Sequence, residues 1–156
     1  MSDHDYYIIK CIELAIVAKD RGDSPVGSVI VKDSQIIAIG IEGGRTHQDV
    51  TFHAEIEAVR QATQFLQTTD LSACTLYTTH EPCIMCSYII RHHKINRVVF
   101  GVTTGEIGGY SSRFPVLLDK TITKWGNPPE IIIGILENQC RELKINNDTR
   151  DAGLVS

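Results

Sequence analysis

The spacing of apolar residues along the chain predicts alternating helices and strands. Over residues 5–19 an apolar residue recurs at every third or fourth position, which is the pattern of an amphipathic helix that ends near Gly22. Two β-branched runs follow, at residues 26–32 and 35–41, and the Asp33-Ser34 pair between them indicates a tight hairpin. We therefore expect a first helix and then two antiparallel strands that begin a sheet.

A polar loop leads from this hairpin to a second helix. Residues 40–52 carry glycines and polar side chains, which is typical of a loop. Thr51 is a suitable N-cap for the next helix, because an apolar stripe continues behind it to Phe65. His53 and Glu55 would then lie in the first turn of this helix.

A third helix is also expected to begin with metal-binding side chains. Residues 74–79 form a short apolar run that predicts a third strand, and Pro82 stands where a helix from residue 83 to about 93 would start. Cys83 and Cys86 would lie at that start. The partial positive charge and free N–H groups of a helix amino terminus lower the pKa of a thiol, which favours metal binding.

The last part of the chain predicts two more strands and a closing helix. Residues 96–102 and 130–136 have the composition of strands, and the long connection between them, with a helical segment around residues 113–119, suits a crossover between parallel neighbours. A final helix is expected from residue 137 to about 146. This order of elements predicts a three-layer α/β/α fold with a five-stranded mixed sheet.

Length and charge narrow the possible partners. The chain has 156 residues, about the size of one domain, so we expect residues 1–156 to form a single domain. Its net charge of −4 gives no broad basic surface, which disfavours nucleic acid as a partner. No apolar run approaches the roughly 20 residues of a membrane span, and residues 1–5 lack the start of a secretion signal. These features predict a cytoplasmic protein without a membrane segment.

The cysteines divide into two groups. Five cysteines in a chain with no recognisable secretion signal argue against a disulfide framework. Cys83 and Cys86 have ligand spacing, whereas Cys11, Cys74 and Cys140 lie in apolar segments and are expected to be small buried residues. Cys74 remains a possible fourth metal ligand.

His53, Cys83 and Cys86 together make a donor set that suits Zn²⁺. Structural zinc sites usually have four protein ligands, whereas three ligands leave a position for water, which the metal acidifies towards neutral pH. Glu55 is not needed as a ligand and can carry the proton of that water to a leaving group. H-x-E followed by P-C-x-x-C is the pattern of zinc-dependent nucleobase deaminases, so the predicted chemistry is hydrolytic deamination.

Several longer motifs surround these residues. They are Pro25-Val26-Gly27, His53-Ala54-Glu55, Thr75-Leu76-Tyr77-Thr78-Thr79, Glu81-Pro82-Cys83-Ile84-Met85-Cys86 and Arg97-Val98-Val99-Phe100-Gly101. Together they span most of the chain and resemble the cytidine deaminase-like superfamily, in its branch of cytosine deaminases, guanine deaminases and tRNA adenosine deaminases.

The resemblance implies a specific fold and site. It implies a cytidine deaminase-like sheet with strand order 2-1-3-4-5, zinc on His53, Cys83 and Cys86, and proton transfer by Glu55. It also implies backbone contacts to the substrate from Ala54 and Cys83, and a homodimer, which is common among such relatives.

The chain departs from this branch in the loop before His53. The branch usually has an asparagine there that bonds to the substrate base, and ungapped alignment places Glu42 at that position. An ionised carboxylate only accepts hydrogen bonds, so Glu42 would favour a substrate that offers N–H donors. The alternative is that Glu42 is a solvated loop residue and the alignment slips. Asp49 is a weaker candidate for the same role.

Other residues are candidates for contact with the substrate. Phe52, Phe114 and Trp125 can stack on a flat heterocycle, although an aromatic side chain near a core more often serves packing. Ala54 and Pro82, beside the ligands, complete the expected pocket.

The remaining histidines and the one basic cluster favour structural roles. His47, His80, His92 and His93 lack ligand spacing to the chosen three residues and are expected to be surface or hydrogen-bonded structural histidines. Residues 91–94 are basic and are expected to form a solvated helix end, because cations favour a helix carboxyl terminus.

Three functions are compatible with these patterns. The preferred hypothesis is a zinc-dependent deaminase that releases ammonia from a small amino-substituted heterocycle, guanine-like or cytosine-like, with Glu55 moving the protons. The second keeps this chemistry but acts on adenosine in a tRNA anticodon, which the acidic net charge disfavours. The third is a non-catalytic zinc domain or a redox Cys83/Cys86 pair. It leaves Glu55 without a role, and Cys74 or His80 would have to complete the zinc coordination.

Overall fold

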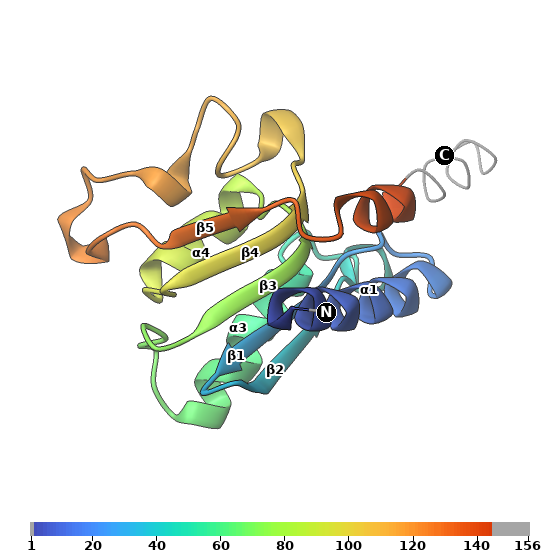
Figure 1. The fold of residues 1–156 in the computed structure, drawn as a ribbon, viewed down its shortest axis with the longest axis horizontal. Helices are drawn as coiled ribbons and strands as arrows, with labels where there is room; N and C mark the ends of the chain where they lie inside the picture. The colour runs from blue at the N-terminus through green and yellow to red at the C-terminus, as the bar shows by residue number, and fades with distance from the viewer. Residues whose placement is uncertain (1, 145–156) are drawn as a thin grey trace.

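The computed structural model describes residues 2–144, which form a five-stranded sheet with helices on both faces (Figure 1). The strand order is β2-β1-β3-β4-β5, so the predicted mixed sheet and its order are confirmed. In chain order, the helices and strands are α1 (Asp3–Asp20), β1 (Gly27–Lys32), β2 (Gln35–Ile41), α2 (Gly44–His47), α3 (Ala54–Leu66), β3 (Thr75–His80), α4 (Ile84–His92), β4 (Arg97–Val102) and β5 (Glu130–Ile133). Within the described range, no helix is long and apolar enough to cross a membrane.

The sheet is antiparallel at one edge and parallel at the other. β1 pairs antiparallel with β2 and with β3, whereas β3, β4 and β5 run parallel. The hairpin between β1 and β2 turns at Asp33 and Ser34, whose φ angles of 51° and 63° are those of a tight two-residue turn. Each parallel pair needs a crossover, and α4 and the connection over residues 103–129 provide the two.

Two hydrophobic cores lie on opposite faces of the sheet. One core lies between the sheet and α3 and α4, and its strand residues include Ile30, Leu76, Val98 and Phe100. The other lies between the sheet and α1, together with the helical residues 137–144, and its strand residues include Val29, Val31, Tyr77 and Val99. Alternate residues of one strand therefore enter different cores, which produces the predicted three layers. Cys11, Cys74 and Cys140 are buried in these cores, as expected.

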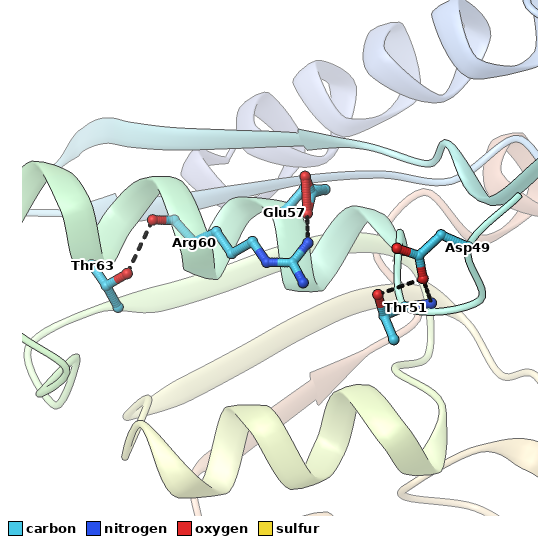
Figure 2. Close-up of polar contacts among 5 residues, drawn as sticks. All are labelled: Asp49, Thr51, Glu57, Arg60 and Thr63. Atoms are coloured by element: carbon cyan, nitrogen blue, oxygen red, sulfur yellow. Dashed lines mark hydrogen bonds and ion pairs between the residues drawn. The ribbon is translucent and has the colours of Figure 1, made fainter. Parts of the chain in front are cut away.

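The entry into α3 differs from the prediction. His53 is the N-cap, and Thr51 is not. The N–H and hydroxyl groups of Thr51 instead donate to the Asp49 carboxylate at 2.9 and 2.7 Å, in a compact turn that Figure 2 shows. Further along, Arg60 pairs with Glu57 on the surface of α3 (Figure 2). His53 therefore has an extended backbone, with φ −82° and ψ 151°, immediately before the helix.

Several predicted segments have different lengths in the structure. The expected loop over residues 40–52 contains the short helix α2, and the helical segment expected around residues 113–119 is reduced to a 3-10 turn at Val116–Leu118. β5 ends at residue 133 instead of 136. Residues 137–144 are helical as predicted, and the expected end of that helix at residues 145–146 lies outside the described residues.

Arg91 contradicts the predicted solvated helix end at residues 91–94. It is 2% exposed at the end of α4, and its guanidinium lies 5.1 Å from the centre of the Trp125 ring. The guanidinium donates hydrogen bonds of 2.8–3.3 Å to the carbonyl groups of Val116, Leu117, Asp119 and Gly126. This single buried cation therefore holds the 103–129 crossover against α4, because burial requires all its N–H groups to find partners.

Candidate active site

Two helix starts bring the three predicted zinc ligands together. His53 is the N-cap of α3, Cys83 is the N-cap of α4, and Cys86 lies in the first turn of α4. The Nδ1 atom of His53 lies 3.5 Å from the sulfur of Cys83 and 3.4 Å from the sulfur of Cys86. All three ligand atoms lie within 4.8 Å of one another. One metal ion would therefore contact all three side chains.

Close backbone packing fixes both helix starts. Gly40 of β2 passes so close to α3 that a Cβ atom there would lie 1.8 Å from the carbonyl oxygen of Ala54. The segment before α4 is held by a hydrogen bond, because the N–H of Gly109 donates to the carbonyl of Pro82, which precedes the N-cap Cys83, at 2.8 Å. The N–H of Cys86 points at the sulfur of Cys83 at 3.4 Å, as expected at a helix amino terminus.

The three ligand side chains change one another's pKa values through hydrogen bonds. The hydrogen bond with Cys86, which has the largest effect, and the hydrogen bond with His53 together lower the pKa of Cys83 to about 4. The hydrogen bond with Cys83 in turn raises the pKa of His53 to about 9. The same neighbour raises the pKa of Cys86 well above its usual value. Cys83 is thus the thiolate of the group, and a bound divalent cation would displace the protons that its neighbours hold.

The donor set fits zinc with an open position. One imidazole nitrogen and two sulfurs are typical zinc ligands, and within residues 2–144 no fourth histidine, cysteine or carboxylate converges with them. Cys74, the possible fourth ligand, precedes β3 whereas Cys83 follows it, so a strand of about 20 Å separates them. The closed four-ligand site of a structural zinc domain is therefore not formed by the described residues.

Glu55 lies in the first turn of α3 and is 4% exposed. Its Oε1 atom is buried and has no hydrogen-bond partner among the described residues. Burial raises the pKa of Glu55 to about 8, because the charged form loses its hydration. A carboxyl group with a pKa near neutral both takes up and releases protons readily, which suits proton transfer.

A pocket of about 210 Å³ opens beside the ligands, and Glu42 and Glu55 both line it. Glu42 is 8% exposed and accepts the N–H of Gly44 at 3.1 Å. Burial raises the pKa of Glu42. Glu42 is therefore a buried pocket residue and not a solvated loop residue. Asp49, the weaker candidate, is exposed and bonds to Thr51 (Figure 2).

Ala54 and Pro82 are next in sequence to residues that line the pocket, Ala54 between His53 and Glu55 and Pro82 between Glu81 and Cys83. Both residues are buried and neither side chain is part of the pocket lining. The N–H of Ala54 interacts with the carboxylate of Glu42, and this contact opposes the effect of burial on the Glu42 pKa. Substrate contact by Ala54 and Pro82 stays a prediction.

The three aromatic candidates lie away from this pocket. Phe52 stacks on His47, with ring centroids 3.8 Å apart, and lines a separate hollow beside α3. Phe114 is 62% exposed, Trp125 is 5% exposed, and both line another hollow in the crossover. None of the three rings lines the pocket beside the zinc ligands, and the crossover that carries Phe114 and Trp125 packs on α4. Stacking of these rings on a substrate stays a prediction.

The structure adds pocket residues that the sequence patterns did not single out. They are Ser24, Val26, His80, Glu81, Thr104, Ile107 and Lys144. His80 is not a surface or fully hydrogen-bonded histidine, because it is 3% exposed and its Nε2 atom has no partner among residues 2–144. Val26 and Glu81 belong to motifs visible in the sequence. Ser24 and His80 each stand directly before such a motif, whereas Thr104, Ile107 and Lys144 come from distant segments that no local pattern connects.

Glu81 organises one wall of the pocket. It is 2% exposed, directly before Pro82. Its two carboxylate oxygens accept the N–H groups of Thr104, Tyr110 and Ser111 and the hydroxyl of Ser111, at 2.7–3.0 Å. Glu81 thus fixes the start of the crossover, including Thr104, beside the zinc ligands.

Comparisons with known proteins agree with this geometry. The model of the cytidine and deoxycytidylate deaminase zinc-binding region matches residues 1–102. A tRNA-specific adenosine deaminase of Buchnera aphidicola subsp. Baizongia pistaciae is 37% identical over 145 residues, which cover 92% of this chain and 87% of the relative.

Two solved structures extend the comparison. A structure from studies of A-to-I editing by tRNA:A34 deaminases is similar with a TM-score of 0.82 and 29% identity, and the match covers 88% of this chain and 98% of the other. A guanine deaminase from Bacillus subtilis is similar with a TM-score of 0.63 and 36% identity, over 66% of each chain. The likeness to the tRNA deaminase structure thus extends over more of both chains.

Proposed function

The chain belongs to the cytidine and deoxycytidylate deaminase zinc-binding family, and from this we propose that it deaminates adenosine in tRNA to inosine. The family makes it a zinc-binding hydrolase of the deaminase class. The observation that carries the choice of substrate is the 37% identity to a tRNA-specific adenosine deaminase over 92% of the chain.

Two expectations from the sequence are corrected by these comparisons. The preference for a small guanine-like or cytosine-like heterocycle is wrong, because curated relatives that match most of the chain are tRNA-specific adenosine deaminases. The expectation that nucleic acid is an unlikely partner is wrong for the same reason. It rested on a net charge of −4, and a whole-chain sum does not describe the charges beside one pocket.

In the proposed reaction, the zinc site and Glu55 have separate tasks. His53, Cys83 and Cys86 would hold the metal. When bound, zinc would lower the pKa of water at the site and stabilise developing negative charge. Glu55 is not needed as a metal ligand and its Oε1 atom has no hydrogen-bond partner among the described residues, so its carboxylate is available for proton transfer.

Glu55 carries protons through the whole reaction. Its carboxylate takes a proton from the attacking water and passes it to a ring nitrogen of the adenine. It then takes the second proton from the hydroxyl group newly bonded to the ring carbon and gives it to the amino group, which leaves as ammonia while the C–O bond becomes a carbonyl. Adenosine and water are thereby converted to inosine and ammonia. A pKa raised to about 8 by burial is suited to both directions of this transfer.

Glu42 is the proposed contact to the base edge. Its carboxylate lines the pocket and uses one oxygen for the N–H of Gly44. A carboxylate can accept more hydrogen bonds than those from Gly44 and Ala54, and the amino group of adenine offers N–H donors. A homodimer and a cytoplasmic location, where tRNA is processed, complete the proposal.

The test is deamination of defined RNAs by zinc-loaded protein. Anticodon stem-loops with adenosine at the wobble position should yield inosine, read as guanosine after reverse transcription, together with one ammonia for each inosine. Free adenosine, guanine and cytosine should release little ammonia. If a free base releases ammonia rapidly and no stem-loop or total tRNA is converted, the proposed substrate is wrong.

A further inference from the structure

His80 occupies the end of β3, inside the same pocket as the zinc ligands. It is 3% exposed and lines the pocket together with Glu42, Glu55 and Lys144. It does not belong to the group of converging metal ligands. The proposed reaction assigns no task to His80, although a buried polar side chain in a pocket needs a partner.

The hydrogen bonds of the Thr79 hydroxyl determine which nitrogen of the His80 ring carries the hydrogen. The Nδ1 atom lies 2.8 Å from the hydroxyl oxygen of Thr79. That oxygen also accepts the N–H of Gly27 at 3.4 Å, and Thr79 is fully buried. Within residues 2–144 the Thr79 hydroxyl has no other acceptor than Nδ1, so it donates there. The ring hydrogen of the neutral imidazole is therefore on Nε2.

The Nε2–H group is a donor without an acceptor in the described part of the protein. Nε2 is buried and makes no hydrogen bond. Burial lowers the pKa of His80 to about 3, so the ring is neutral near pH 7 and carries one hydrogen. A buried donor without a partner destabilises the protein, which indicates that the acceptor comes from outside residues 2–144.

The charge near His80 indicates what kind of acceptor this is. Lys144 lines the same pocket, and its positive charge acts on His80. The nearby carboxylate of Glu81 is occupied by donors from Thr104, Tyr110 and Ser111. A neutral N–H donor beside an ammonium group favours an anionic oxygen, because charge-assisted hydrogen bonds are the stronger ones.

We propose that the Nε2–H group of His80 and the ammonium group of Lys144 bind a phosphate oxygen of the substrate nucleotide. The proposal rests on the proposed function, since it assumes a nucleotide in the pocket. It adds a contact that distinguishes a nucleotide within RNA from a free nucleoside. His80 would thus make the enzyme selective for a nucleotide over a free nucleoside.

The test compares product ligands that cannot react further. Inosine, inosine 5′-monophosphate and inosine 3′-monophosphate are titrated into the zinc-loaded protein, and their affinities are measured by calorimetry. The wild-type protein should bind one of the two monophosphates about tenfold more tightly than inosine, as expected for one charge-assisted hydrogen bond. The two isomers show whether the phosphate lies on the 5′ or the 3′ side.

Variants connect this preference to the two side chains. His80→Leu should remove the preference for phosphate while affinity for inosine changes little, and His80→Gln, which can place an amide N–H in the pocket, should restore part of it. Lys144→Ala should weaken the preference, whereas Lys124→Ala, an exposed lysine in the crossover, should not. A purely structural role of His80 would weaken all three ligands equally.

Two results would overturn the inference. One is a wild-type protein that binds neither monophosphate better than inosine, whether or not stem-loops are deaminated. The other is an unchanged preference in His80→Leu. Nitrogen-15 spectra of the His80 ring add an independent check, because the hydrogen must be on Nε2. Failure of the proposed function itself would appear separately, as a lack of inosine in the stem-loop assay.

Discussion

The hydroxyl group of Thr46 in α2 donates a hydrogen bond of 2.6 Å to the carboxylate of Asp23, which follows α1. Asp23 is fully buried and also accepts the N–H groups of Arg45 and Thr46 at 3.0 and 2.9 Å. The loop that carries Glu42 is thereby fastened to the end of the first helix. A residue with no contact to the zinc ligands thus fixes one wall of the pocket.

Replacement of Asp23 by alanine should loosen this wall. The change leaves the N–H groups of Arg45 and Thr46 without an acceptor, and such losses cost about 1–3 kcal/mol of unfolding free energy. The Michaelis constant for the stem-loop should rise more than the turnover number falls, because Glu42 is displaced and Glu55 is not. Denaturant unfolding and steady-state kinetics measure both effects. Asp20→Ala, an exposed change nearby, is the control. Equal behaviour of the two variants would contradict this role.

Replacement of Glu55 by glutamine should separate metal binding from catalysis. Glutamine has nearly the same size and cannot carry a proton, so turnover should fall by a factor of about 100 to 10,000. Zinc content should remain that of the wild type, because Glu55 is not among the converging ligands. Metal analysis and stem-loop deamination measure the two properties.

A matched control exists in the same helix. Glu57 pairs with Arg60 on the surface of α3 (Figure 2), so Glu57→Gln should keep both zinc and activity. If Glu55→Gln deaminates the stem-loop at a near-normal rate, another group moves the protons.

The zinc ligands and Glu55 could be predicted because their signals are local. His53 and Glu55 are two residues apart, Cys83 and Cys86 three, and each pair stands beside a recognisable helix start. The sheet order was also accessible, through strand patterns and the family resemblance. The zinc ligands, Glu55 and the individual strands depend on short stretches of sequence, whereas the order of the strands was implied by the family resemblance.

The rest of the site depends on contacts between distant segments. Trp125 was a candidate for substrate stacking, but Arg91 draws the crossover onto α4 and packs against the Trp125 ring. His80 and Lys144 are far apart in sequence and meet only when β3 and the last helix are in place. The charge of the pocket also depends on the fold, because the net charge of the chain does not show that a lysine lies in the pocket.

Removal of zinc should expose one reactive cysteine. The hydrogen bond with Cys86 lowers the pKa of Cys83 to about 4, so Cys83 is a thiolate at pH 7 when no metal is bound. Iodoacetamide should therefore alkylate Cys83 rapidly, whereas Cys86 is buried and its raised pKa keeps it a thiol. Mass spectrometry of digested protein identifies the modified residue.

The pH dependence of the alkylation rate tests whether the pKa of Cys83 is lowered. A depressed pKa means that the alkylation rate stays high from pH 9 down to about pH 5 and falls only as the pH approaches 4. Zinc-loaded protein should be protected throughout. A rate that rises steeply between pH 7 and pH 9, as for an ordinary thiol, would show that Cys86 and His53 do not stabilise the Cys83 thiolate.

Replacement of Glu81 by glutamine should release the start of the crossover. Glu81 accepts four hydrogen bonds, three of them from backbone N–H groups of residues 104–111. A glutamine amide turns one acceptor oxygen into an NH₂ group that faces N–H donors, so at least one donor loses its partner. The unfolding free energy should fall by about 1–3 kcal/mol. Urea unfolding followed by circular dichroism measures this loss.

The activity of Glu81→Gln should fall together with its stability. Thr104 and Ile107 line the pocket and belong to the segment that loses its hydrogen bonds, so both would be displaced. Zinc content should remain high, since Cys83 is still held at the start of α4. The control is Glu106→Gln, an exposed change within the same segment that breaks none of these hydrogen bonds. If Glu81→Gln and Glu106→Gln unfold at the same urea concentration, the four hydrogen bonds do not hold the crossover in place.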